Sequence, residues 1–470
     1  VDQSLEYKDK NGKPYLAYGH DYHPDLPTDG NFLNNGLVDP YRNPHPHLSE
    51  VKKVYEPVHF NYLGNGILEI ENKNFFADFS DKSLQLKLLV NGKEHILKKD
   101  IALNINPQSK VKMHFSEIPD MFIPESEFIL EVNLIQKEAD EMIPKGHEVA
   151  WEQFILQKRN KINNHHQKQN LKIAESTIHE IYDEKSLIHI DKKTGEILNW
   201  SFRHLEITNK PIKLNFWRPP TDNDLGHGMD KWAKNWQKAS YNYESTLIKK
   251  PIKTKNGITF KVAYKLPNNE AKVVVDYTLN SLGELKVNYS YKPNKNDLPN
   301  IPRIGMYLTL PKNYNKVSWY GKGPNESYWD RKTGQKIGLF SGKVKEQFHV
   351  YSRPQETGNK TDIRWMQVSS ENIHLKVTSN QLLNSSVWPF HMKELDFNSS
   401  EAAKSASGLV PVTKKHGADI KLGETIQWNI DLQQMGVGGD TSWGRLVHKE
   451  YTIPANKTYK YSFTITPLTK

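Results

Sequence analysis

A glycine-rich segment near the end of the sequence carries an aromatic side chain that could contact a sugar. Trp443 follows the run Gly436-Val437-Gly438-Gly439-Asp440-Thr441-Ser442. The C–H face of a sugar packs on an indole ring, and burial of an aromatic ring contributes on the order of 1.5–3 kcal/mol. The residues alone leave two interpretations open: Trp443 is either a sugar platform or a core tryptophan at a hairpin.

A second candidate is a source of oxygen ligands near the start of the sequence. In the stretch from Asn31 to Asn35, Phe32 offers a backbone carbonyl and Asn35 offers a side-chain amide, three residues apart. Hard monovalent or divalent cations take such oxygens. The stretch is therefore either part of a cation site or a plain turn.

An acidic segment, Asp222-Asn223-Asp224-Leu225-Gly226, has the composition of a calcium loop. It lacks the 12-residue spacing and the closing glutamate of that motif, so the sequence favours an ordinary loop over a metal site. Gly226 is free to adopt a positive φ, and Gly228 extends that freedom.

Histidines and other carboxylates give weaker indications. A His-Pro-His run is stiff, and its rings do not converge as they would from positions i and i+4 of a helix, so it does not favour a catalytic metal. We expect Asp330 and Arg331 to pair across strands, and Glu326 and Glu356 to be isolated carboxylates. We find no Ser-His-Asp order and no phosphate loop. The histidines considered are His20, His23, His45 and His47.

Short runs of alternating apolar and polar residues predict that half-buried strands position these groups. The run Leu84–Leu88 precedes Asn91-Gly92, a pair that supplies the two positive-φ residues of a type I′ hairpin turn. Helical periodicity is short and scarce. Further hairpins are predicted at 187–200 and 273–291, and short helices at 46–54 and 229–239.

Composition excludes several classes of protein. The 470 residues contain no Cys, which rules out disulfides, zinc-thiolate sites and Cys nucleophiles. The net charge of +10 comes from Lys residues spread along the chain rather than from a basic run with stacking aromatics, so we expect no nucleic-acid partner. The mean hydropathy is −0.73 and no stretch approaches ~20 apolar residues, so we expect a soluble chain and no membrane partner. Cytoplasm and periplasm remain equally open.

The sequence divides into four parts by composition. The start, Val1-Asp2-Gln3-Ser4, has no initiator Met and no leader pattern, so we expect a start inside a longer protein. A polar stretch almost without apolar residues predicts a linker. The expected parts are a loop-rich region at 1–55, a strand-rich domain at 56–156, the linker at 157–170 and a long all-β unit at 171–470.

Four segments together resemble bacterial β-galactosidases of glycoside hydrolase family two, in the family's order and over the whole chain. The resemblance implies the C-terminal tail of a (β/α)8 barrel, then an immunoglobulin-like β-sandwich, then a large antiparallel sandwich of the galactose-mutarotase-like kind. The expected fold is therefore mainly β. The segments are Val1–Val38 with Pro44-His45-Pro46, Phe216–Gly226, Trp319–Arg331 and Met435–Trp443.

The resemblance also assigns roles to residues. It implies that Trp443 lines the sugar site, mainly under the leaving-group sugar, and that the Phe32 carbonyl and the Asn35 side chain bind a sodium ion that orients the galactose 6-hydroxyl. Asp29 would support that site. The segment Asp222–Gly226, including Asn223 and Asp224, would be a mobile loop beside the site, hinged at its glycine.

In the family, two glutamates about 5 Å apart act as acid/base and as nucleophile. In the family these glutamates, the usual magnesium ligands and one sodium ligand lie upstream of the point where this sequence begins. We therefore expect the C-terminal portion of a retaining enzyme that acts on lactose-like β-galactosides, inactive alone, completed by the N-terminal and barrel portion, and homo-oligomeric when intact. The alternatives are a complementing subunit and a sugar-binding or epimerase-like sandwich.

Overall fold

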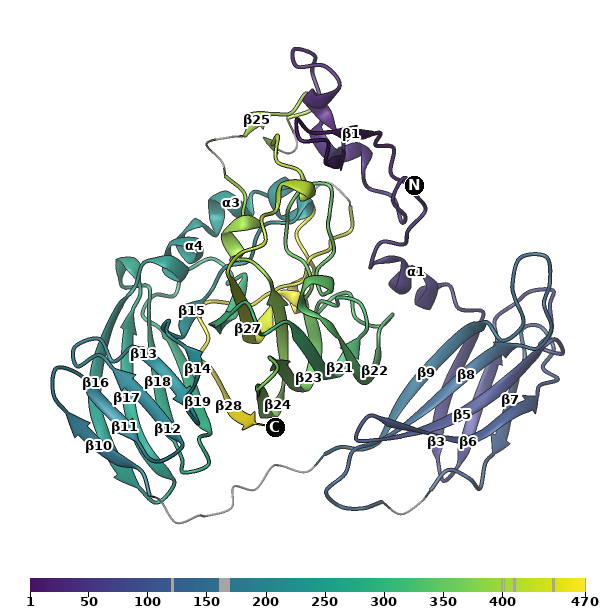
Figure 1. Ribbon diagram of the computed structural model, residues 1–470. Coiled ribbons are helices and arrows are strands. Elements are labelled where there is room, and N and C mark those ends of the chain that lie inside the picture. Colours follow the sequence, from purple (N-terminus) through teal and green to yellow (C-terminus); the bar gives the residue numbers. More distant parts are fainter. Residues whose placement is uncertain are drawn as a thin grey trace. The chain divides into compact units, whose positions relative to one another are not determined.

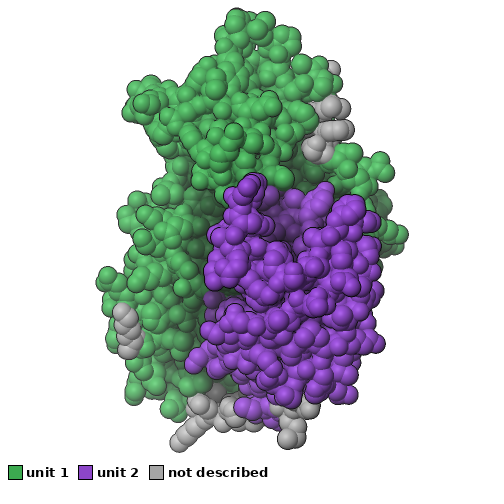
Figure 2. Space-filling view, turned by 90° about the vertical axis from the view of Figure 1, so that its right-hand side faces the viewer, with its two compact units in different colours: residues 1–46, 164–332, 340–470 green, residues 47–163, 333–339 purple. Residues whose placement is uncertain are grey.

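The computed structural model divides into two compact units, which are coloured separately in Figure 2. Unit 1 comprises residues 1–46, 164–332 and 340–470, and unit 2 comprises residues 47–163 and 333–339. The structure describes residues 1–119, 122–159, 170–398, 400, 402–408, 411–441 and 444–469. The greater part of the expected linker, and both Ser442 and Trp443, lie outside the described residues.

Unit 2 is an antiparallel β-sandwich of a three-stranded and a four-stranded sheet, in the strand orders β3-β4-β7 and β6-β5-β8-β9. Its strands alternate buried and exposed residues, and the inward-facing side chains form one separate hydrophobic core. Seven strands in two sheets agree with the expected immunoglobulin-like domain. The elements are α1 (Leu48–Val54), β3 (Val58–Gly64), β4 (Ile67–Asn72), β5 (Lys82–Val90), β6 (Lys93–Ala102), β7 (Lys110–His114), β8 (Phe128–Gln136) and β9 (Glu148–Gln157).

Unit 2 is completed by a segment from much later in the sequence, residues 333–339. The ammonium of Lys336 donates to Glu131 at 2.9 Å and to Glu148 at 2.7 Å, and the backbone N–H of Ile337 donates to Gln153 at 2.7 Å. Glu131 is almost completely buried, so Lys336 compensates a charge that would otherwise be costly to bury.

Unit 1 contains a five-stranded sheet, β10-β11-β12-β13-β14, and a twelve-stranded antiparallel sheet. The long sheet runs β15-β20-β27-β24-β28-β19-β18-β17-β16, and β23 extends it from β24 to β21 (Figure 1). The late strands β27 and β28 lie in the middle of this order, so the sheet closes only when the end of the chain is in place. Two sheets of this size confirm the predicted large antiparallel sandwich.

The elements of unit 1 follow in chain order. Its strands are β1 (Glu6–Lys8), β2 (Pro14–Leu16), β10 (Lys172–Glu175), β11 (His179–Tyr182), β12 (Ser186–Ile190), β13 (Ile197–Phe202), β14 (Leu205–Thr208), β15 (Lys213–Asn215), β16 (Glu244–Thr254), β17 (Gly257–Lys265), β18 (Ala271–Leu279), β19 (Leu285–Pro293), β20 (Arg303–Pro311), β21 (Lys316–Gly323), β22 (Lys336–Lys343, partly in unit 2), β23 (Lys360–Ser369), β24 (Ile373–Trp388), β25 (Ala403–Lys404), β26 (Pro411–Val412), β27 (Thr425–Gln434) and β28 (Tyr459–Thr469). Its helices are α2 (Asp222–Gly226), α3 (Met229–Trp232) and α4 (Lys234–Tyr241), with short 3-10 turns that include Gly19–Asp21 and Gly30–Leu33.

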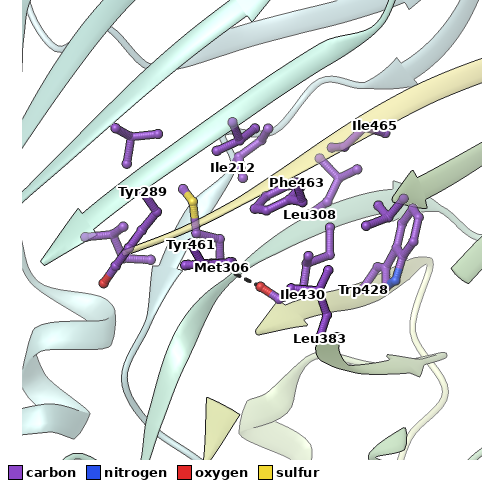
Figure 3. Close-up of a cluster of buried hydrophobic side chains, with 14 of the residues drawn as sticks. Ile212, Tyr289, Met306, Leu308, Leu383, Trp428, Ile430, Tyr461, Phe463 and Ile465 are labelled. Carbon is purple, nitrogen blue, oxygen red and sulfur yellow. Dashed lines mark hydrogen bonds between the residues drawn. The ribbon is translucent and has the colours of Figure 1, made fainter. Parts of the chain in front are cut away.

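The core of unit 1 is rich in aromatic side chains that come from strands distant in the sequence (Figure 3). Trp428 of β27 and Tyr461 and Phe463 of β28 pack with Met306 of β20, all less than 4% exposed. The Tyr461 hydroxyl donates to the backbone oxygen of Ile430 at 3.0 Å, which satisfies its polar end inside the core. Each such ring contributes about 1.5–3 kcal/mol by burial.

The predicted hairpins are confirmed. β5 pairs with β6, and the turn residues Asn91 and Gly92 have φ of 50° and 85°, as a type I′ turn requires. β12 pairs with β13, and β18 pairs with β19. The helix expected at 46–54 is α1, whereas the one expected at 229–239 is two short helices, α3 and α4, with a break at Ala233.

The loop predicted at Asp222–Gly226 is wrong, because these residues form helix α2. Thr221 caps it: the Thr221 hydroxyl accepts the backbone N–H of Asp224 at 3.2 Å, and the Asp224 carboxylate accepts the N–H of Thr221 at 3.0 Å. This reciprocal capping box was visible in the sequence as a threonine followed three residues later by an acid. The glycine with a left-handed φ is Gly228, at 78°, rather than Gly226.

Among the described residues, no helix is long and apolar enough to cross a membrane.

Candidate functional site

A buried arginine joins two of the four segments that the sequence singles out. Arg218, completely buried just before helix α2, donates through Nη2 to Asp224 Oδ1 at 2.8 Å and to the Gly436 carbonyl at 2.8 Å. It also donates through Nη1 to the Met435 carbonyl. The start of the glycine-rich turn is therefore fixed to the acidic segment by one guanidinium group.

Asp224 is the ionic partner of that arginine rather than a metal ligand. Burial alone would raise the pKa of its carboxyl, but the charge of Arg218 and hydrogen bonds from His227 and Thr221 outweigh burial and hold the pKa at about 2. The carboxylate is therefore charged at neutral pH, and it anchors helix α2 to the sheet.

Gly444, which follows Trp443 in the sequence, lies directly against the end of helix α2. A Cβ atom on Gly444 would lie only 2.4 Å from the carbonyl carbon of Gly226, so only glycine fits there without a shift of the backbone. Gly444 also has a φ of 113°, which disfavours any other residue. Gly444 is therefore packed on the acidic segment.

The third segment supports the same turn from Asp330. Its two carboxylate oxygens accept the backbone N–H groups of Val437 at 3.0 Å and Gly438 at 2.7 Å. The predicted cross-strand pair of Asp330 and Arg331 is therefore wrong: Asp330 binds the turn, and Arg331 donates to Glu326 at 2.6 Å. The predicted pairing failed because Asp330 and the turn are more than 100 residues apart in the sequence.

We expect Asp330→Ala to loosen the glycine-rich turn. Two charge-assisted hydrogen bonds are lost, so the free energy of unfolding should fall by about 1–3 kcal/mol, and the amides of Val437 and Gly438 should exchange faster with solvent. Hydrogen exchange of this chain measures both effects. Asp330→Asn keeps one acceptor oxygen and should lose less, and equal exchange in all three proteins would contradict the role of Asp330.

The first segment reaches helix α2 through Asn31. The Asn31 amide donates to Asp222 Oδ2 at 3.0 Å, and the guanidinium of Arg353 donates to the other oxygen, Oδ1, at 2.7 Å. Arg353 is itself buried and also donates to the Pro220 carbonyl at 3.0 Å. Asp222 is therefore fixed on both oxygens, and the loop that holds Phe32 and Asn35 lies beside helix α2.

The expected sodium residues lie in and after the 3-10 turn Gly30–Leu33. Phe32 is 43% exposed and Asn35 is also exposed. Asp29 accepts both the backbone N–H and the hydroxyl of Ser407, at 2.9 and 2.5 Å. These hydrogen bonds tie this loop to the 402–408 segment and lower the pKa of the Asp29 carboxyl.

The two carboxylates predicted to be isolated are in fact held in buried networks. Glu326 accepts hydrogen bonds from Arg331, Tyr351 and Thr357, and it also accepts the N–H of Gly358. Burial would raise its pKa, but the charge of Arg331 and these hydrogen bonds lower it.

Glu356 pairs with the equally buried Arg303 at 3.0 Å, and Gln434 donates to it at 3.3 Å. Burial raises the pKa of Glu356 more than the charge of Arg303 lowers it. Sequence reasoning missed both networks, since their partners come from distant strands.

The four segments thus meet within unit 1, at the carboxyl end of β27 and around helix α2. Among the described residues, no group of three or more histidine or acidic side chains is arranged to hold a metal ion. The arrangement is a set of loops in which Asn31 of the first segment and Gly444 both contact helix α2.

Three family models match consecutive stretches of the chain. The glycosyl hydrolases family 2 TIM barrel domain matches residues 1–60, β-galactosidase domain 4 matches 68–157, and the β-galactosidase small chain matches 183–465. The chain therefore combines a barrel fragment of glycoside hydrolase family 2 with two β-galactosidase domains. The chain belongs, more narrowly, to the β-galactosidase small chain family.

Curated relatives match over the whole chain. A β-galactosidase from Priestia megaterium is 32% identical over 483 residues, covering 99% of this chain and 44% of the relative. One from Lactobacillus delbrueckii subsp. bulgaricus is 30% identical over 473 residues, covering 100% of this chain and 44% of the relative. The chain thus corresponds to the C-terminal part of a β-galactosidase and spans less than half the length of these relatives.

Solved structures include the expected galactose-mutarotase-like neighbours. A galactose mutarotase related enzyme from Lactobacillus acidophilus is similar over 62% of this chain and 97% of that chain, with 11% identity and a TM-score of 0.34. Likeness at this level carries no argument about function.

Proposed function

We propose that this chain is the C-terminal portion of a retaining β-galactosidase that hydrolyses terminal non-reducing β-D-galactose residues of lactose-like β-galactosides. The observation that carries the proposal is the convergence of the four family segments within unit 1, through Arg218, Asp222 and Asp330. Segments up to 400 residues apart meet at one place, as residues that surround a substrate must.

In this proposal the chain supplies three parts of the active site. The Phe32 carbonyl and the Asn35 side chain hold a sodium ion that orients the galactose 6-hydroxyl, and Asp29 supports their loop. The segment Asp222–Gly226, with Asn223 and Asp224, moves beside the site. Trp443 stacks on the leaving-group sugar. Neutral oxygens on an exposed turn and the contact between Gly444 and Gly226 support the first two assignments.

Two acidic residues of helix α2 are held by different contacts, which affects how this segment can move. Asp224 is locked to Arg218 in the buried core, whereas Asp222 binds Asn31 and Arg353 near the surface. Motion that opens the site therefore breaks the contacts of Asp222 first, and the left-handed Gly228 that follows the helix is the position where the backbone turns.

The rest of the enzyme supplies the chemistry. We propose that the acid/base and nucleophile glutamates, the magnesium ligands and the last sodium ligand belong to an N-terminal and barrel portion, and that the intact enzyme is a homo-oligomer. Two carboxyl groups about 5–5.5 Å apart are required for a retaining mechanism. A complementing subunit without its own catalysis is the second candidate, because each unit has a separate hydrophobic core of its own.

The test of the sugar platform is Trp443→Ala in the enzyme reconstituted with its barrel portion. Loss of a stacking ring worth about 1–3 kcal/mol should lower kcat/KM roughly tenfold to a hundredfold. The loss should differ between lactose and a nitrophenyl galactoside, because the ring lies under the leaving group.

The melting temperature, measured in parallel, separates this from a core role. A core tryptophan would lower the melting temperature by several degrees and reduce both activities equally. That result would overturn the platform assignment.

A further inference from the structure

A chain of buried polar side chains connects the terminal sandwich to the loop that carries Asn35. His349 Nε2 lies 2.8 Å from His45 Nδ1, and His45 Nε2 lies 2.8 Å from Asp2 Oδ2. The other oxygen of Asp2 accepts the backbone N–H of Gly36 at 2.7 Å. His349 thereby reaches the residue next to Asn35 through two intermediates.

Residues at the start of the sequence also hydrogen-bond to the backbone on either side of Asn35. Asp2 donates its own N–H to the Val38 carbonyl at 2.9 Å, and Gln3 donates to the Leu33 carbonyl at 3.0 Å. A Cβ on Gly36 would lie 2.5 Å from the backbone of Val1, so the chain segments around Gly36 and Val1 are in direct contact. The side chain of Asp2 is 1% exposed, so solvent does not replace these contacts.

The contact between the two imidazoles restricts their protonation. A short N···N contact holds one proton, shared by a donor and an acceptor, so His45 and His349 cannot both carry two protons while it persists. The Asp2 carboxylate favours a proton on His45 Nε2. A second positive charge on the pair would leave two N–H groups facing each other, and the contact would break.

The surroundings keep His349 neutral. Burial lowers the pKa of its imidazole, the charge of Glu326 opposes this, and the charges of His45 and Arg331 lower the pKa further. Because the folded form disfavours protonation of His349, the contact is intact above the ordinary histidine pKa of about 6.5, and it is lost only when the pH falls far enough below that value for the pair to take a second positive charge. The charged and titratable groups that face the pair are Asp2, Asp39, Glu326, Arg331 and Tyr351.

We propose that His349 is a positioning residue for the Phe32–Asn35 loop, acting through His45 and Asp2, and that a second positive charge on the histidine pair releases this loop. The consequence for cation binding rests on the proposed function, whereas the release of the loop does not. The sequence did not favour a catalytic metal at His45. The structure instead gives His45 a hydrogen-bond partner, His349, that lies 304 residues away in the sequence.

Hydrogen exchange of the full chain tests the release directly. The protection factor of the Gly36 amide, corrected for intrinsic exchange, should fall at least tenfold between pH 7 and pH 4.5. His349→Gln offers an N–H to His45 but cannot titrate, so Gly36 should stay protected at both pH values. His349→Leu should lose protection at both.

A matched control is His391→Gln, a half-buried histidine of the same unit whose pKa burial also lowers but which lies outside this chain of contacts. It should behave as the unaltered protein does. Equal protection of Gly36 in all variants, or an unchanged pH dependence in His349→Gln, would overturn the proposal. If His349→Leu fails to fold, the comparison with His349→Gln at pH 4.5 still decides.

A second measurement separates this proposal from the proposed function. In the reconstituted enzyme, His349→Leu should raise the sodium concentration for half-maximal activity at least threefold, and His349→Gln should restore it. A pH-dependent loop with no effect on sodium would uphold the positioning by His349 and contradict the sodium assignment of Phe32 and Asn35. No pH dependence of the loop, with sodium still required, would contradict the positioning alone.

Discussion

Purified by itself, this chain is expected to hydrolyse a chromogenic β-galactoside no faster than the uncatalysed reaction. Retaining hydrolysis needs a protonated carboxyl at the leaving oxygen and a second carboxylate as nucleophile, and such enzymes accelerate their reactions 10⁶-fold or more. The two buried glutamates that lie near the four segments do not fill these roles. Glu326 and Glu356 are at most 5% exposed and are held by Arg331 and Arg303.

The control for this result is addition of the barrel portion of the enzyme, which should restore turnover. A sample of the chain alone that turns over substrate at an enzyme-like rate would contradict the proposed division of the active site. The sandwich would then need a catalytic pair of its own.

The second large effect is expected for Asp224→Asn. The change keeps the shape of the side chain but leaves the buried charge of Arg218 without its ionic partner, so the free energy of unfolding should fall by about 3–5 kcal/mol. Denaturant unfolding followed by tryptophan fluorescence measures it, because Trp151 is the only tryptophan in the sequence of unit 2 and the signal reports on unit 1.

The same pair predicts a pH dependence. Because the folded-state pKa of Asp224 is about 2, below its ordinary value, the stabilisation is complete above about pH 4 and is lost as the pH falls towards 2. Asp224→Asn should remove that part of the acid sensitivity.

Two further variants check this interpretation. Asp276→Asn makes the same chemical change in a partly exposed surface pair with Lys261 and should cost less than about 1 kcal/mol. The double variant Arg218→Met/Asp224→Leu removes both charges and should be less destabilised than Asp224→Asn. A double variant as unstable as the sum of the single variants would show that packing, rather than charge, dominates at this position.

Local sequence patterns predicted the fold well, because the signals for strands and turns lie within a few residues. The hairpin at Asn91-Gly92 required only alternation and a pair of residues that tolerate positive φ. Helix α2 was missed although its capping box was present, because its five residues are too few to show a helical repeat and were interpreted as an ordinary loop ending at Gly226. Thr221 carried the decisive signal.

The candidate site was predicted only as separate segments. The order of motifs indicated that they belong to one enzyme family, but not which side chains join them. Arg218 binds the Gly436 carbonyl across 218 residues, and Asp330 binds Gly438 across 108. Such contacts depend on strand order in the twelve-stranded sheet, which no local pattern encodes. The role of Trp443 stays a prediction.

The position of residues 333–339 in unit 2 has a consequence for synthesis on the ribosome. The seven strands of that sandwich are complete at Gln157, yet Lys336 emerges almost 180 residues later. At 5–20 residues per second, the nascent domain waits roughly 10–35 s with the buried Glu131 lacking this cation. During that interval the domain is a folding intermediate, and its final stability is acquired only after the 164–332 part of unit 1 has been translated.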